Sequence, residues 1–149
     1  LSWQHAVRWF HHKYGDFKNF ICLPATSPLR NVDDISAAIT KRKVTRADIC
    51  LSITPAERNP YFNMVKKNST DFFELVIPSD GQISRRQDAP DVFDITTVVY
   101  VADPIFILEG NGVFSGNVTA VEVPKCRAVD IDDIFDFWYA EAILAKEAE

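Results

Sequence analysis

Two aspartates separated by one residue, Asp130 and Asp132, lie near the carboxyl end of the chain in the sequence AVDIDDIFDF. In an extended segment, residues i and i+2 face the same side, and two such carboxylates repel unless protons or a cation lie between them. Magnesium is held by one or two carboxylates together with substrate phosphates. Capping of the following helix, to which we assign Asp133 and Asp136, is the simpler explanation of the cluster taken alone.

A loop with two adjacent hydroxyl groups, LPATSPLR at residues 23–30, follows the apolar run NFICL. Ser27 precedes a proline, which holds it in an extended conformation, and Thr26 and Ser27 can each donate and accept hydrogen bonds. Ligands of open α/β sheets bind beyond the carboxyl ends of the strands. The loop therefore indicates a ligand contact, and an ordinary connection in which Asn31 caps the next helix fits the residues equally well.

A third candidate is the polar segment RRQDAP, which begins with Arg85 and Arg86. Guanidinium groups bind carboxylates and phosphates through two parallel hydrogen bonds. A solvated loop, or salt bridges to the many acids of the chain, explains a single arginine pair as well.

The first half of the chain must position these groups through a helix at residues 1–15, closed by Gly15, and a strand–helix–strand unit. The unit consists of a strand within 17–23, a helix at 31–44 with Asn31 as its N-cap, and a strand at 47–53. We expect its two strands to be parallel.

The second half begins with two β-like runs at residues 61–77, which predict a hairpin, and continues with strands at 96–102 and 118–123. A helix closes the chain, and its expected buried side consists of Ile134, Phe137, Trp138, Ala140 and Leu144. The pattern predicts an α/β fold, with a single three-layer domain over 1–149 and a projecting β arm at about 57–93.

Composition narrows the class of protein. The 149 residues are 47% hydrophobic and 25% charged, with a formal charge of -5, which favours an ordered domain that binds neither nucleic acid nor an anionic membrane. No apolar run is long enough to cross a bilayer. The three cysteines form no C-x-x-C pair, and we expect reduced thiols and a cytoplasmic protein.

Taken in order, four segments resemble those of the acylneuraminate (CMP-sialic acid) cytidylyltransferases. LPATSPLRNVDDI resembles the family's L-Q-P-T-S-P-L-R loop, RNPYFNMV its H/N-P-Y segment, RRQDAPDVF its R-R-Q-x-x-P-x-x-[YF] segment, and VDIDDIFDF its D-I-D motif. The resemblance implies a three-layer Rossmann-like nucleotidyltransferase fold. This fold is expected to be incomplete at its N-terminus, because the family's A-R-x-G-S-K-G nucleotide loop has no counterpart here.

The resemblance also implies roles for individual residues. Asp130 and Asp132 match the catalytic pair that binds Mg²⁺, and Thr26 and Ser27 match the loop beside the sugar and the reacting phosphate. The other residues that match the family's sugar-binding positions are Arg86, Gln87, Tyr100 and Phe114. In the family the β arm reaches a second subunit, so the resemblance implies a homodimer.

The reaction implied is the transfer of CMP from CTP to a 2-keto-3-deoxy acid sugar, such as a sialic or related nonulosonic acid, with release of pyrophosphate. The chain departs from the family pattern at Pro24, where glutamine is usual, and at Asp94, where some members have arginine. Two alternatives stay open: a non-catalytic sugar-binding or dimerising relative, and a magnesium-dependent phosphate enzyme of another kind.

Overall fold

The computed structural model describes residues 2–78, 83 and 85–147. These residues form two compact units, one made of Leu1–Thr54 with Ile95–Glu149 and the other of Pro55–Asp94. The arm predicted at about 57–93 includes residues 79–82 and 84, which lie outside the described residues.

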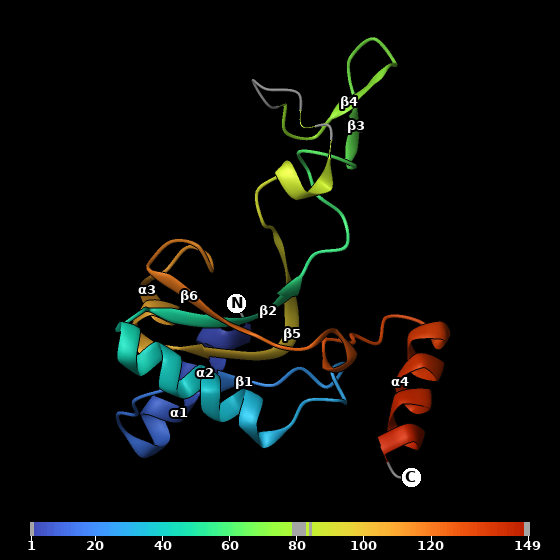
Figure 1. Ribbon diagram of the computed structural model, residues 1–149. Helices are drawn as coiled ribbons and strands as arrows, with labels where there is room; N and C mark the ends of the chain where they lie inside the picture. Colours follow the sequence, from blue (N-terminus) through green and yellow to red (C-terminus); the bar gives the residue numbers. More distant parts are fainter. Residues whose placement is uncertain (1, 79–82, 84, 148–149) are drawn as a thin grey trace. The chain divides into compact units, whose positions relative to one another are not determined.

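The first unit is built on a four-stranded sheet with the order β1-β5-β2-β6 (Figure 1). Its strands are β1 (Phe20–Cys22), β5 (Phe93–Ala102), β2 (Ile49–Pro55) and β6 (Val118–Glu122). β6 is parallel to β2, whereas β5 is antiparallel to β1. β5 is also antiparallel to β2, because the Asp103 amide at its end donates to the Asp48 carbonyl before the start of β2.

The two strands of the predicted strand–helix–strand unit, β1 and β2, are parallel, which confirms the prediction. In the sheet, β5 lies between them. The second half of β5 is apolar and buried, and Val98, Val99 and Val101 have no exposed area. A central position pairs both hydrogen-bonding edges of β5, while the helix layers cover the two faces of the sheet.

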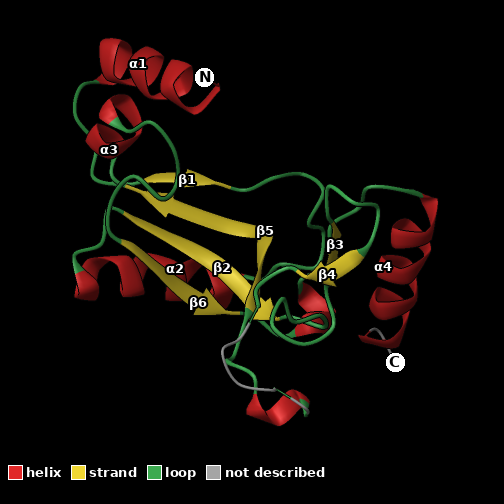
Figure 2. Ribbon diagram, turned by 90° about the horizontal axis from the view of Figure 1, so that it is seen from above, coloured by secondary structure: helices red, strands yellow, loops and turns green. Residues whose placement is uncertain are grey.

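Helices cover the two faces of the sheet, which gives the predicted three layers (Figure 2). On one face α2 (Val32–Thr45) packs through Ala38 against Cys50, Val98 and Val123. On the other face α1 (Ser2–Tyr14) and α3 (Pro104–Glu109) pack through Val7 and Ile107 against Ile49 and Leu51.

Local signals fix where the helices begin and end. Asn31 and Asp34 form a complete capping box at the start of α2, as predicted for Asn31. Gly15, in the left-handed region at φ 85°, follows α1, and its amide donates to the His11 carbonyl. Pro104 begins α3 after the Asp103 cap.

The last helix, α4 (Ile134–Glu147), buries only one of the five residues predicted to form its buried side. Ala140 is buried, but the four other residues expected to be buried are about half exposed: Ile134 52%, Phe137 49%, Trp138 54% and Leu144 49%. The helix packs through Ala140 and Ile143 onto Leu29 and Val129. The contact between α4 and the rest of the unit therefore forms at Ala140, a small residue that allows close approach. The large apolar side chains of the helix lie outside this contact.

The second unit contains the predicted hairpin. β3 (Val65–Lys67) pairs antiparallel with β4 (Phe73–Leu75), with Lys66 opposite Glu74. The segment expected as a polar loop forms one turn of 3-10 helix at Arg86–Asp88. A similar turn lies in the first unit at Lys125–Arg127, just after β6.

In the part of the chain that the structure describes, no helix combines the length and apolar character needed to span a bilayer.

A buried hydroxyl group in β2 generates a stability prediction. Ser52 has no exposed area, and its Oγ accepts from the Val99 amide (3.0 Å) and from Thr96 Oγ1 (2.7 Å). Ser52→Ala should lower the free energy of unfolding by about 1–3 kcal/mol, because it removes a buried acceptor. The exposed Ser36→Ala should change it by less than about 0.5 kcal/mol. Equal urea midpoints for the two variants would contradict the assignment.

Candidate active site

The carboxyl ends of β1, β2 and β6 lie at one edge of the sheet, because these three strands are parallel. The loop after β1 contains Thr26 and Ser27, and the segment after β6 contains Asp130 and Asp132. One backbone hydrogen bond joins the two: the amide of Ile131, between the aspartates, donates to the Thr26 carbonyl (2.8 Å). The structure thus brings together the hydroxyl-bearing loop and the acidic pair.

The hydroxyl of Ser27 is fixed by a residue that sequence reasoning missed. Ser27 is 2% exposed, and its Oγ lies 2.5 Å from Oγ1 of Thr97 on β5. Thr26 is exposed. Ser27 therefore anchors the loop to the sheet and Thr26 remains open to solvent. The TTVV run marks a strand but not this contact between residues far apart in sequence.

A second interaction missed in the sequence holds the acidic segment. Arg127 donates from Nε (3.0 Å) and Nη2 (2.7 Å) to the two carboxylate oxygens of Asp34, which is 5% exposed. Burial acts to raise the pKa of Asp34, but the hydrogen bonds from Arg127 and Asn31 and the charge of Arg127 outweigh it and lower the pKa below its ordinary value. The pair ties the segment three residues before Asp130 to the start of α2.

Capping uses only part of the acidic cluster. Asp133 Oδ1 accepts from the amides of Phe135 (2.7 Å) and Asp136 (3.1 Å), and Asp136 Oδ2 accepts from the amides of Asp132 (3.0 Å) and Asp133 (3.1 Å). These bonds form a capping box at the start of α4. The assignment of Asp133 and Asp136 to capping is therefore supported by the geometry, and the side chains of Asp130 and Asp132 take no part in it.

Asp130 keeps a carboxylate oxygen that nothing in the described structure satisfies. Its Oδ1 is buried and has no hydrogen-bond partner, while Asp132 is exposed. Among the described residues no group of three or more His, Cys, Asp or Glu side chains could hold a metal ion. Two carboxylates with a free buried oxygen fit an ion that takes its other ligands from water and substrate phosphates, as Mg²⁺ does.

Tyr100 lies close to the same acid. It is half-buried on β5, opposite Cys22 of β1, with its ring centroid 5.3 Å from that of Trp3. Burial raises the pKa of Tyr100, and the Cys22 thiol and the Asp130 carboxylate raise it further. The phenol is a hydrogen-bond donor at neutral pH.

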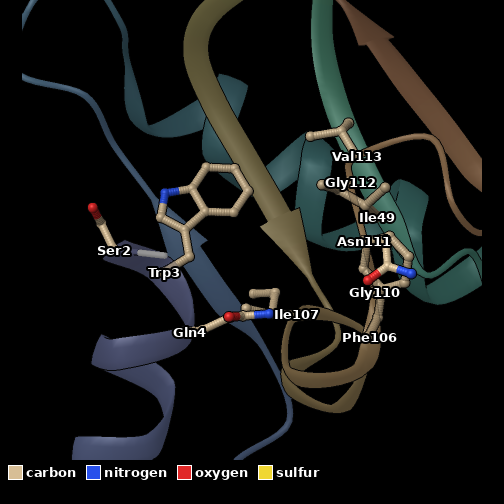
Figure 3. A pocket seen from close by; sticks show the side chains of 10 residues that line it. All are labelled: Ser2, Trp3, Gln4, Ile49, Phe106, Ile107, Gly110, Asn111, Gly112 and Val113. Carbon is tan, nitrogen blue, oxygen red and sulfur yellow. The ribbon is translucent and has the colours of Figure 1, made fainter.

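Phe114 is not brought to this edge. It is 70% exposed in the loop between α3 and the start of β6, at the amino edge of the sheet. That loop borders a separate cavity of about 530 Å³, into which Figure 3 shows Trp3 projecting. The cavity is lined by Ser2, Trp3, Gln4, Ile49, Phe106, Ile107, Gly110, Asn111, Gly112 and Val113. It holds none of the predicted site residues.

Arg86 and Gln87 belong to the second unit. Both are exposed on the 3-10 turn, and Nη2 of Arg86 donates to the Ala56 carbonyl (3.1 Å). That hydrogen bond closes the base of this unit, where the Ala56 amide also donates to the Val92 carbonyl (3.0 Å).

Sheet order and helix layers define a three-layer, Rossmann-like α/β fold. The fold matches that of a solved 4-diphosphocytidyl-2C-methyl-D-erythritol synthase from Anaerococcus prevotii, with a TM-score of 0.61 and 11% identity. The match covers 93% of this chain and 64% of the other.

Sequence comparison identifies relatives over most of the chain. This chain is 30% identical over 129 residues to the CMP-N,N'-diacetyllegionaminic acid synthase of Campylobacter jejuni subsp. jejuni serotype O:2. It is 28% identical over 131 residues to the post-translational flagellin modification protein B of Campylobacter coli. The matches cover 87% and 88% of this chain. The predicted resemblance to CMP-acid-sugar cytidylyltransferases is therefore confirmed.

The chain spans about half the length, 54%, of both curated relatives. No family model matches the sequence.

The Asp34–Arg127 pair generates a prediction about pH. Asp34→Asn should lower the free energy of unfolding by about 3 kcal/mol at pH 7, because it leaves a half-buried guanidinium without its anion. The pKa of Asp34 is lowered on folding from its ordinary value of 3.8, so this contribution is complete above that value and is lost as the pH falls through the lower, folded-state pKa.

Urea unfolding of both proteins from pH 7 to pH 2 measures this difference. The gap between wild type and variant should close only below about pH 4. A gap independent of pH would refute the assignment.

Proposed function

We propose that this chain carries the acid-sugar site of a magnesium-dependent cytidylyltransferase, which transfers CMP from CTP to a nonulosonic acid and releases pyrophosphate. The observation that carries the proposal is the Ile131–Thr26 hydrogen bond, which joins the acidic pair to the hydroxyl-bearing loop at the carboxyl edge. The legionaminic acid synthase among the relatives supports the choice of sugar class.

Asp130 and Asp132 hold Mg²⁺ in this proposal. Mg²⁺ bound by these two carboxylates would supply neutralisation of the phosphate charge during the transfer. The chain's own groups position the reactants, which is the main contribution that a protein makes to this chemistry. The buried, unpartnered Oδ1 of Asp130 is the best-prepared ligand.

The sugar occupies the space beside Thr26 and Tyr100. Thr26 offers an exposed hydroxyl next to the acidic pair, and the Tyr100 phenol, whose pKa burial raises further, is protonated at neutral pH. Both can donate to the oxygens of a polyhydroxylated acid. The proposed roles of Arg86, Gln87 and Phe114 rest on the family resemblance.

Replacing the acidic pair tests the proposal. Asp130→Asn and Asp132→Asn should each lower the rate of CMP-sugar formation by about 100-fold or more, because each removes a charged ligand of the ion. The rate is measured as pyrophosphate release from CTP, Mg²⁺ and a panel of nonulosonic acids. Asp16→Asn, which changes an exposed acid at the other edge, should leave the rate unchanged.

Wild-type levels of pyrophosphate release from both site variants would refute the role of the pair. Binding of acid sugar by wild type without any CMP-sugar product would favour the non-catalytic alternative. Hydrolysis of a simple phosphate ester that depends on both aspartates, without sugar binding, would favour a different phosphate enzyme.

We also propose that the hairpin of the second unit mediates a homodimer. Large apolar side chains are exposed on it, with Phe72 73% exposed, Phe73 68% and Val65 58%. An apolar cluster of this size on a short hairpin indicates a protein contact. A second copy is the partner that the family resemblance implies.

Sedimentation of hairpin variants measures this contact. The double variant Phe72→Ser, Phe73→Ser should shift the protein from dimer to monomer at micromolar concentration, because it removes two exposed aromatic anchors. Lys67→Ser on the same hairpin is the matched control and should remain dimeric. A dimer that survives the double change would exclude this surface as the interface.

A further inference from the structure

The loop after β1 ends at a cation, Arg30, whose surroundings are unusual for a half-buried charge. Its Nη2 donates to the Pro24 carbonyl, so the guanidinium folds back over the loop that holds Thr26 and Ser27. Its Nε is buried and has no acceptor. One side of the group is thus anchored, and the other lacks a partner.

Comparison with the other half-buried cations shows that Arg30 lacks a carboxylate partner among the described residues. Only Arg30, Arg42 and Arg127 are half-buried among the described lysines and arginines, and the others are exposed. Arg42 pairs with Asp103 at 2.8 Å, and Arg127 pairs with Asp34 at 2.7 Å. Within the residues that the structure describes, no carboxylate pairs with Arg30.

A half-buried guanidinium without an anion is unfavourable, because water is removed from the charge and nothing replaces it. The uncharged Cys22 thiol is the neighbour that interacts with Arg30, and burial lowers the pKa of the arginine. A planar guanidinium remains charged under these conditions and binds carboxylate or phosphate oxygens through its fork of donors.

We propose that Arg30 binds an oxyanion of the ligand, and that this oxyanion is the counter-charge the described residues lack. The inference deepens the proposed function and rests on its site: it requires an anionic ligand, held by a carboxylate or phosphate group, on the loop that the Ile131 amide joins to the acidic pair. In the sequence Arg30 is the cation that ends the LPATSPLR loop, and it was given no role of its own there.

Titration calorimetry on the full chain tests the proposal with three probes: N-acetylneuraminic acid, its methyl ester, and magnesium pyrophosphate. Binding of the free acid but not of the ester identifies a carboxylate, and binding of pyrophosphate identifies a phosphate. Arg30→Gln should weaken binding of the oxyanion probe by about 10- to 100-fold, because it removes hydrogen bonds to a charged group. Arg8→Gln, an exposed arginine on α1, should bind as wild type does.

The variant Arg30→Lys separates a binding role of Arg30 from a purely structural one, because a structural role predicts unchanged affinity for the oxyanion. Arg30→Lys keeps the charge but loses the fork, so it should fold and bind the oxyanion probe about tenfold more weakly than wild type. This variant decides the question if Arg30→Gln does not fold. Unchanged affinity in Arg30→Lys, or no binding of any oxyanion probe by wild type, would overturn the proposal.

Turnover is measured separately from binding. Oxyanion binding that depends on Arg30, without CMP-sugar formation, would reject the proposed activity and leave this inference standing. CMP-sugar formation that is unaffected by either change at Arg30 would support the proposed activity and reject the role of Arg30 in oxyanion binding.

Discussion

The buried ion pair between Asp34 and Arg127 is the interaction on which the geometry of the site depends. Asp34 serves twice: it completes the capping box that starts α2, and it accepts two hydrogen bonds from the segment that leaves β6. Because a carboxylate that is 5% exposed cannot lose its partner without a large desolvation cost, the two segments cannot separate cheaply. The Ile131–Thr26 hydrogen bond then sets the position of the acidic pair against the loop after β1.

In this arrangement the aspartates form different interactions. Asp133 and Asp136 satisfy the free amides at the start of α4, and Asp34 satisfies an arginine. In the described part of the chain, the side chains of Asp130 and Asp132 take no part in helix capping or in the Asp34–Arg127 ion pair. A cluster that helix capping could have explained in full is therefore explained by it only in part, and the remainder is available for a cation.

Features encoded within a few residues could be predicted from the sequence, and features that depend on distant pairing could not. The Asn31 cap, the stop at Gly15 and the hairpin are local, and each was found where expected. The insertion of β5 between β1 and β2 depends on contacts between residues far apart in sequence, such as Ser52 and Thr96, which are 44 positions apart. The buried side of α4 was mispredicted because hydrophobicity indicated the large residues, whereas close approach at Ala140 decided the contact.

The buried polar atoms that lack hydrogen-bond partners indicate where the fold can bind a polar ligand. Three such side-chain atoms occur among the described residues: Arg30 Nε, Thr54 Oγ1 and Asp130 Oδ1. They follow or end β1, β2 and β6, the three parallel strands, at their carboxyl ends. Native proteins rarely leave such groups unsatisfied, so their confinement to one edge is better explained by a polar ligand than by imperfect packing. A cation at Asp130 Oδ1, an oxyanion at Arg30 Nε and a polar ligand group at Thr54 Oγ1 would together satisfy all three atoms.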